Sequence, residues 1–296
     1  MRALVISGGG SKGAFAGGVA EYLINECKFD YEILVGTSTG SLLVPLLAIE
    51  EIDKLKAVYT NVCQKDIFSI NPFTISKKNG ETTVGINHFN IVLQFLLGRK
   101  TFGNSSNLRS LIPKIFCKED YVKIKDSGKK VVVTVANLSR DNIEYKYLRD
   151  CTYDDFCEWM WISTNFVPFM SLAIKNGYEY ADGGFGDFVP IQEALNIGAK
   201  EIDVIVLNPR VPQIKKVHST NAFNLLMSSF DFMLHQIGKD DMIIGMLESR
   251  YSNVKVNFFH TPRKLTEISF VFEPEIMKGW WKEGYEFADK KLNGHK

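Results

Sequence analysis

The sequence predicts an α/β protein whose central sheet is mostly parallel and is covered by helices on both faces. Strand-like and helix-like stretches alternate from the first residues, which is typical of this class. A strand, a glycine-rich turn, a helix and a second strand follow one another within about 35 residues, and such a βαβ unit makes neighbouring parallel strands. With 45% hydrophobic and 23% charged residues, the chain of 296 residues has an ordinary globular composition.

The first elements follow from local patterns. We expect a strand at 2–7, a helix at 14–27, a strand at 31–35 and a helix from about 41. In the first helix, Phe15, Val19 and Leu23 recur at helical spacing. Pro45 lies early in the second helix, where the loss of a backbone hydrogen bond is expected to kink the axis.

The middle and end of the chain are less regular. Residues 69–89 are rich in Asn, Gly, Thr, Ser and Lys, so we expect an irregular connection there, of a length that is usually functional or mobile. Further helices are expected at 89–97, 107–116, 222–251 (one long helix or two short ones) and 274–292, and further strands at 130–138, 143–148, 178–181, 201–207 and 254–259.

Charge and cysteine content limit the class of partner and compartment. Lys and Arg (35) nearly balance Asp and Glu (34), so no long-range field attracts nucleic acid, and we expect no nucleic-acid partner. Five cysteines without a CxxC pair fit a reducing compartment, and no signal-peptide pattern opens the chain, so a cytoplasmic location is expected. The longest apolar run, 42–49, allows only peripheral membrane contact.

The most informative motif is Gly36-Thr37-Ser38-Thr39-Gly40, a GxSxG between the second strand and the following helix. In a nucleophile elbow, the serine occupies a tight strand-to-helix turn, and small neighbours let the backbone pass while the side chain stays exposed. The alternative interpretation is a small-residue turn in which Ser38 or Thr39 caps the helix.

A second motif, Gly8-Gly9-Gly10-Ser11-Lys12-Gly13, follows the first strand and opens the first helix. Its glycines allow positive φ angles, and backbone N–H groups at a helix N-terminus can hold an oxyanion or a phosphate. Because the first two strands are expected to be adjacent and parallel, this loop and the Ser38 turn should share one crevice at the carboxyl ends of the strands.

The same loop also matches GxGxxG, so a dinucleotide-binding Rossmann domain is the main rival interpretation. That fold places an acidic residue at the end of the second strand to bind the ribose. Here the strand ends in Val35-Gly36-Thr37, and Asp30 and Glu32 lie before or within it. A Walker A loop is excluded because Ala14 follows Gly13.

A nucleophilic serine needs a base. The five histidines, His88, His218, His235, His260 and His295, lie in no motif that recommends them, and we expect none of them to take part in the chemistry. The better candidate is Asp182, in Asp182-Gly183-Gly184 after a short strand, although Asp-Gly-Gly is also an ordinary turn sequence.

Together, the glycine loop, the GxSxG and the Asp-Gly-Gly resemble the patatin-like phospholipase family in order and spacing. Ser163-Thr164 followed by Pro168-Phe169 is similar to the family's approach to its Asp-Gly-Gly, and Val189-Pro190 to its continuation. The resemblance covers residues 2 to about 210 well and the remainder loosely. It implies a three-layer α/β/α fold in a single domain over 1–296, with a motif-bearing core at about 1–210 and a helical part at about 220–296.

The resemblance also implies an activity, a serine hydrolase that cleaves acyl esters of phospholipids or lysophospholipids through a Ser38–Asp182 dyad. The amides of Gly8, Gly9 and Gly10 would form the oxyanion hole, and Gly13, Gly36, Gly40, Gly183 and Gly184 complete the motifs. Lys12 is expected near the oxyanion, or else as a structural tether. No cofactor and no metal is implied. A third interpretation is a patatin-fold effector whose activity stays latent until a partner or a membrane reorganises the site.

Overall fold

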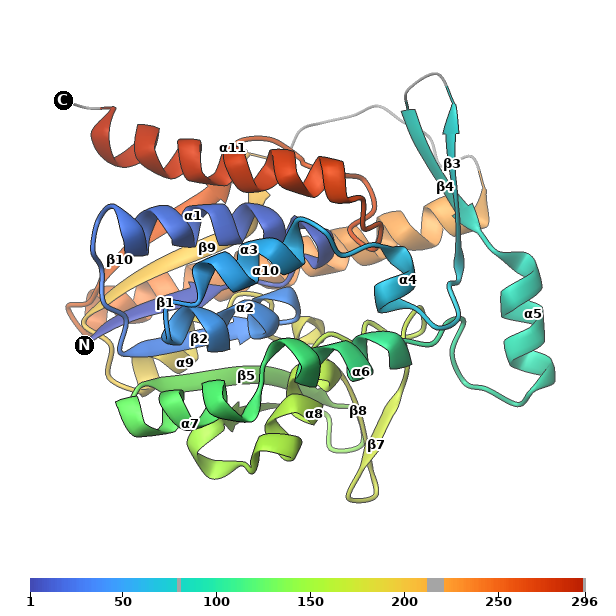
Figure 1. Ribbon diagram of the computed structural model, residues 1–296, viewed down its shortest axis with the longest axis horizontal. Coiled ribbons are helices and arrows are strands. Elements are labelled where there is room, and N and C mark those ends of the chain that lie inside the picture. The colour runs from blue at the N-terminus through green and yellow to red at the C-terminus, as the bar shows by residue number, and fades with distance from the viewer. Residues whose placement is uncertain (79–80, 212–220, 295–296) are drawn as a thin grey trace.

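The computed structural model describes residues 1–78, 81–211 and 221–294, and within them a mixed sheet lies between two layers of helices (Figure 1). The strand order is β10-β9-β1-β2-β5-β8-β7, and β6 also pairs with β5. The pairs from β10 to β5 are parallel, whereas the pairs that β5 makes with β6 and β8 are antiparallel. The expected three-layer α/β/α architecture with a mostly parallel sheet is therefore confirmed.

Successive side chains along a strand point to opposite faces of the sheet, and both faces are buried. Leu4 and Ile6 of β1 pack into one hydrophobic cluster, and Ala3 and Val5 pack into the other. The strands of the sheet are β1 Arg2–Ile6, β2 Ile33–Thr37, β5 Lys130–Asn137, β6 Asn142–Tyr147, β7 Ala173–Lys175, β8 Tyr178–Asp182, β9 Glu201–Pro209 and β10 Lys255–Thr261.

The two helical layers differ in size. The larger cluster, on the face with Leu4 and Ile6, joins the sheet to α1, α2, α3, α6, α8 and α11, and the smaller one to α9 and α10. The helices are α1 Gly13–Asn25, α2 Thr39–Ala48, α3 Ile52–Tyr59, α4 Gln64–Ile67, α5 His88–Leu96, α6 Ser106–Ile115, α7 Lys118–Ser127, α8 Tyr153–Ser163, α9 Ile191–Asn196, α10 Ala222–Tyr251 and α11 Pro274–Asn293.

Most elements lie within a few residues of their predicted places. The stretch 222–251 forms one long helix, α10, rather than two short ones. The helix α2 continues through Pro45 to Ala48, so the proline does not end it. No helix among the described residues combines the length and the apolar character that crossing a membrane requires.

The prediction of an irregular connection at 69–89 is wrong. Strands β3 Phe73–Lys78 and β4 Glu81–Ile86 form an antiparallel hairpin beside α5, apart from the main sheet (Figure 1). The polar composition concealed β-branched residues such as Ile75, Thr83 and Val84, which favour strands. The hairpin is anchored by Phe73, which is 2% exposed and stacks on Phe169 and Phe270.

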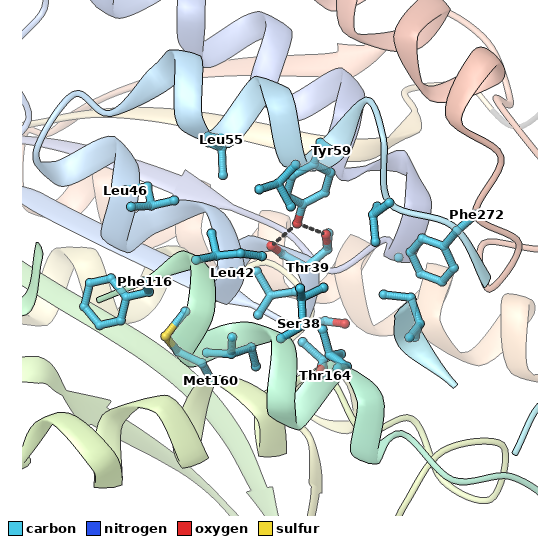
Figure 2. A pocket seen from close by; sticks show the side chains of 18 of the residues that line it. Ser38, Thr39, Leu42, Leu46, Leu55, Tyr59, Phe116, Met160, Thr164 and Phe272 are labelled. Carbon is cyan, nitrogen blue, oxygen red and sulfur yellow. Dashed lines mark hydrogen bonds between the residues drawn. The ribbon is translucent and has the colours of Figure 1, made fainter. Parts of the chain in front are cut away.

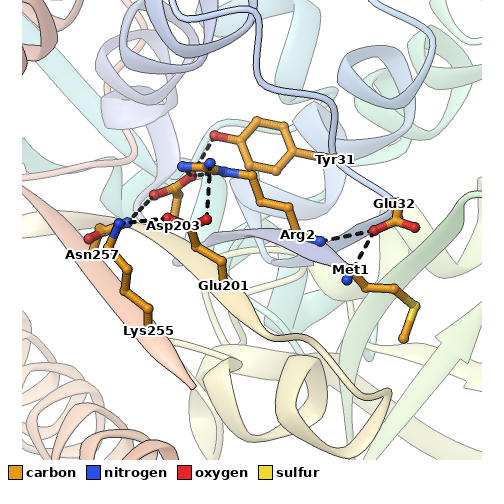
Figure 3. A network of polar contacts seen from close by, with 8 residues as sticks. All are labelled: Met1, Arg2, Tyr31, Glu32, Glu201, Asp203, Lys255 and Asn257. Carbon is orange, nitrogen blue, oxygen red and sulfur yellow. Dashed lines mark hydrogen bonds and ion pairs between the residues drawn. The ribbon is translucent and has the colours of Figure 1, made fainter. Parts of the chain in front are cut away.

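A polar network ties the strands together at the edge where the parallel strands begin (Figure 3). The Asp203 carboxylate, 1% exposed, accepts hydrogen bonds from the Arg2 guanidinium (2.8 Å), the Tyr31 hydroxyl (2.9 Å) and the Asn257 amide (2.8 Å). Arg2 also pairs with Glu201 at 3.2 Å. Because it joins β1, β9 and β10 far from their carboxyl ends, this network is structural.

Candidate active site

Ser38 occupies a strained turn between β2 and α2. Its backbone has φ 54° and ψ −121°, a conformation that a residue with a side chain rarely adopts. The glycines on either side are required by space: a Cβ at Gly36 would lie 2.3 Å from the carbonyl carbon of Gly40, and a Cβ at Gly40 would lie 2.3 Å from the carbonyl oxygen of Ile6. The turn therefore has the geometry of a nucleophile elbow.

A hydrogen-bond network under the turn holds this conformation. The backbone N–H of Ser38 donates to Oγ of Ser163 (3.1 Å), which in turn donates to the carbonyl of Thr134 in β5 (2.6 Å). The hydroxyl of Ser41 donates to the Ser38 carbonyl (2.5 Å). Ser163 is fully buried at the end of α8. From the sequence, Ser163 was only part of a family-like pattern, and its contact with the Ser38 turn was not predicted.

Asp182 is the last residue of β8 and is 3% exposed. The antiparallel pairing of β8 with β5 places it opposite Val135, and its Oδ1 accepts the N–H of Gly184 at 2.8 Å. Burial raises the pKa of Asp182 to about 7, while hydrogen bonds from the Ser38 hydroxyl and the Gly184 amide act to lower it. The structure thus brings Ser38 and Asp182 together. A Cβ at Gly183 would lie 2.4 Å from the carbonyl oxygen of Thr134.

The glycine loop lies against the Ser38 turn, as the parallel pairing of β1 and β2 predicts. A Cβ at Gly8 would lie 3.4 Å from Cβ of Ser38. The N–H of Gly8, however, donates to the carbonyl of Phe188 at 3.1 Å. In the part of the chain that the structure describes, the N–H groups of Gly9 and Gly10 have no acceptor, and Gly10 has φ +55°.

One further backbone donor was missed from the sequence. The N–H of Thr39 has no acceptor within residues 1–78, 81–211 and 221–294, because Thr39 is the first residue of α2. In nucleophile elbows, the amide after the serine commonly belongs to the oxyanion hole, and this general rule is the signal that could have found it. Gly10, Ser38 and Thr39 all line the same cavity.

Lys12 points elsewhere. Its Nζ donates to Oδ1 of Asn208 at 3.0 Å, at the end of β9, and the side chain is 9% exposed. Burial lowers the pKa of Lys12 to about 8. Lys12 does not line the cavity beside Ser38. Of the two roles expected for this lysine, its contacts support the structural tether.

Ser38 lines an apolar cavity that is partly open to solvent (Figure 2). The described lining contains no charged side chain, and the hydroxyls of Thr39 and Tyr59 bond to each other at 2.7 Å. Helices α2, α3, α6 and α8 supply most of the wall, with Leu42, Leu46, Leu55, Leu108, Leu111, Ile112, Ile115 and Met160. The helix predicted at 107–116 thus contributes to the lining of this cavity.

None of the described histidines lines the cavity. His260 lies near the end of β10, where its Nδ1 is 3.3 Å from the carbonyl oxygen of Asn208, and burial lowers its pKa. Both His235 and His260 border a separate hollow beside Phe188. His218 and His295 lie outside the described residues. It stays a prediction that no histidine takes part in the chemistry.

The fold and this site define an α/β protein with a serine elbow at an apolar cavity. The family model of the patatin-like phospholipases matches residues 4–195, and the chain belongs to this family. The solved structure of VipD from Legionella pneumophila is similar, with a TM-score of 0.54 and 13% sequence identity over 99% of this chain and 67% of that chain. At that identity the likeness concerns the fold alone. No curated protein matches the sequence.

Proposed function

We propose that the protein hydrolyses acyl ester bonds of phospholipids or lysophospholipids, with Ser38 as nucleophile and Asp182 as its base. The single observation that carries this proposal is the position of Ser38, which lies in a strained turn at an apolar cavity and beside the buried carboxylate of Asp182. Family membership supports lipid acyl hydrolysis in general. The dyad and the choice of substrate rest on the geometry.

Asp182 has the right environment for a general base. A base is most effective when its pKa lies near the working pH, and burial raises the pKa of Asp182 to about 7. In the first step, Asp182 accepts the hydroxyl proton of Ser38 while Oγ bonds to the ester carbonyl carbon. The tetrahedral intermediate then collapses, the alcohol of the lipid leaves with that proton, and an acyl-serine remains.

The second step reverses these roles. Water gives a proton to Asp182 and attacks the acyl-serine, and the fatty acid leaves as Oγ of Ser38 regains its proton. In both steps a negative charge develops on the former carbonyl oxygen. Of the three glycine amides expected to stabilise it, that of Gly8 is engaged by Phe188. We assign the oxyanion hole to Gly9, Gly10 and Thr39, and one such donor typically contributes about 2.7–4 kcal/mol.

The cavity is suited to an acyl chain. Most of its described wall is aliphatic or aromatic, so a long hydrocarbon chain is bound by burial of apolar surface, at about 25 cal/mol per Å². The proposed chemistry uses no cofactor, metal or nucleic acid. A cytoplasmic location with peripheral membrane contact belongs to the same proposal.

Labelling with a serine-directed fluorophosphonate, followed by mapping of the modified residue, tests the nucleophile. We expect a single adduct on Ser38 and no adduct in Ser38→Ala. The parent protein should release fatty acid from phosphatidylcholine, and Ser38→Ala should not. Ser110→Ala, at an exposed serine on α6, is the matched control. Undiminished fatty-acid release by Ser38→Ala would overturn the proposal, and saturable binding of NAD(P) would then favour the dinucleotide interpretation.

A further inference from the structure

Helix α5 has its polar and apolar faces reversed relative to an ordinary surface helix. Gln94 is only 2% exposed and Asn90 donates inward to the carbonyl of Asn71, whereas large apolar side chains face outward. We call these outward residues the α5 surface: Phe89 (76% exposed), Val92, Leu93, Phe95, Leu96 (80% exposed) and Leu97. A contiguous apolar surface of this kind marks an interaction site.

The α5 surface is connected to the candidate active site by packed rings. Phe95 contacts Phe102 with centroids 5.9 Å apart, Phe102 contacts Phe169 at 5.6 Å, and Phe169 contacts Phe270 at 6.0 Å. Phe270 lines the cavity beside Ser38. Figure 1 shows α5 at the end of the molecule to which the carboxyl ends of the parallel strands point. The α5 surface therefore belongs to the same end of the protein as the cavity.

Charge around α5 favours an anionic partner. Residues 87–104, which contain α5 and the segment that follows it, hold two basic residues, Arg99 and Lys100, and no Asp or Glu. Lys100 pairs with Glu179. Arg99, two residues after the α5 surface, is exposed and has no ion pair among the described residues. Basic residues beside a membrane-inserting segment are attracted to anionic lipid headgroups.

We propose that the α5 surface docks the protein on an anionic lipid bilayer. The helix has nine residues, a length of about 13 Å, so it can lie in the interface but cannot cross it. Phe89, Phe95 and Leu96 enter the boundary between headgroups and acyl chains, and Arg99 and Lys100 contact the headgroups. The choice of a bilayer rather than a protein partner rests on the proposed function, because a phospholipid substrate must enter the cavity from a membrane.

The test measures binding without catalysis. All proteins carry Ser38→Ala, so that vesicles are not hydrolysed, and co-sedimentation is compared on vesicles of phosphatidylcholine alone and of phosphatidylcholine mixed with phosphatidylserine. We expect tighter binding to the anionic vesicles. The triple variant Phe89→Ser, Phe95→Ser, Leu96→Ser should need at least about tenfold more lipid for half-binding. Ile174→Ser, at a 67% exposed apolar residue of β7, is the matched control and should bind like its parent.

Each outcome decides the proposal. A triple variant that melts like its parent and still binds anionic vesicles equally would overturn it. If the parent forms dimers and does not bind vesicles, and the triple variant is monomeric, the α5 surface would be assigned to contact with a second copy of the chain. Hydrolysis of a water-soluble ester by the unmodified protein tests the proposed function separately, so failure of the one proposal can be distinguished from failure of the other.

Discussion

The backbone N–H of Ser38 donates to the hydroxyl of Ser163, 3.1 Å away, and joins two residues that lie 125 positions apart. Since Ser163 also donates to the carbonyl of Thr134, this one hydroxyl connects the Ser38 turn to α8 and to β5. The strand β5 pairs with the strand that ends in Asp182. Ser163 is therefore placed to position Ser38, the proposed nucleophile, relative to Asp182, its proposed base.

The first prediction concerns the replacement of Ser163 by alanine, which should slow hydrolysis. The N–H of Ser38 and the carbonyl of Thr134 lose their common partner, so Ser38 shifts relative to Asp182. We expect kcat to fall by up to about 100-fold while KM stays nearly constant, because the cavity is unchanged. The loss of a buried hydrogen bond also lowers the free energy of unfolding by about 1–3 kcal/mol.

Ser249→Ala is the control for this loss of stability. Ser249 is also buried, and it donates to the carbonyl of Met246 in α10, outside the site. If Ser163→Ala lowers the melting temperature as Ser249→Ala does but leaves kcat unchanged, Ser163 has no part in positioning Ser38.

The pH dependence of hydrolysis follows from the environment of Asp182. Burial raises its pKa to about 7, so the carboxyl is protonated below that pH and cannot accept the proton of Ser38. We expect kcat/KM for a soluble ester to rise with pH through about 7 and to level off above it. Asp182→Asn should remove this ionisation together with the activity. A rate that is constant from pH 5 to pH 8 would contradict the role of Asp182.

The length of the cavity predicts a preference for long acyl chains. Leu46 lies two helical turns beyond Ser38, about 12 Å along α2, at the far end of the cavity in Figure 2. Leu46→Trp should block that end, so that kcat/KM for a palmitoyl ester falls at least about tenfold relative to a butyryl ester. Leu46→Met, of similar volume, should change the ratio little. An equal loss on both esters would show that the chain does not extend to Leu46.

The parts of the fold that the sequence predicts well are those set by local patterns. The glycine loop and the Ser38 turn each follow an apolar strand directly, and the short βαβ unit makes those strands parallel neighbours, so their proximity could be predicted. The position of Asp182 could not, because it depends on an antiparallel pairing of β5 with β8 that no local signal specifies. Only the resemblance to a family linked Asp182 to Ser38.

Contacts between distant segments account for the remaining differences. The Gly8 amide is hydrogen-bonded because the carbonyl of Phe188 lies next to it. Lys12 is held in place because its Nζ reaches the side chain of Asn208. The hairpin at 73–86 could not be predicted from composition, because polar residues outnumber the β-branched ones that favour its strands. The cavity is formed by four helices from separate parts of the chain, so its shape follows from packing that one-dimensional periodicity does not describe.

The network around Asp203 predicts a loss of stability that is separate from the chemistry. Asp203→Ala leaves the buried Tyr31 hydroxyl without its acceptor, whereas Arg2 keeps its pair with Glu201, so we expect a loss of about 1–3 kcal/mol. Glu201→Ala removes a more exposed partner of Arg2 and should cost no more than about 1 kcal/mol. Urea unfolding of both variants measures the difference. Because the network lies at the opposite edge of the sheet from Ser38, folded Asp203→Ala should react with a fluorophosphonate at the parental rate, and a slower reaction would show that the two edges are coupled.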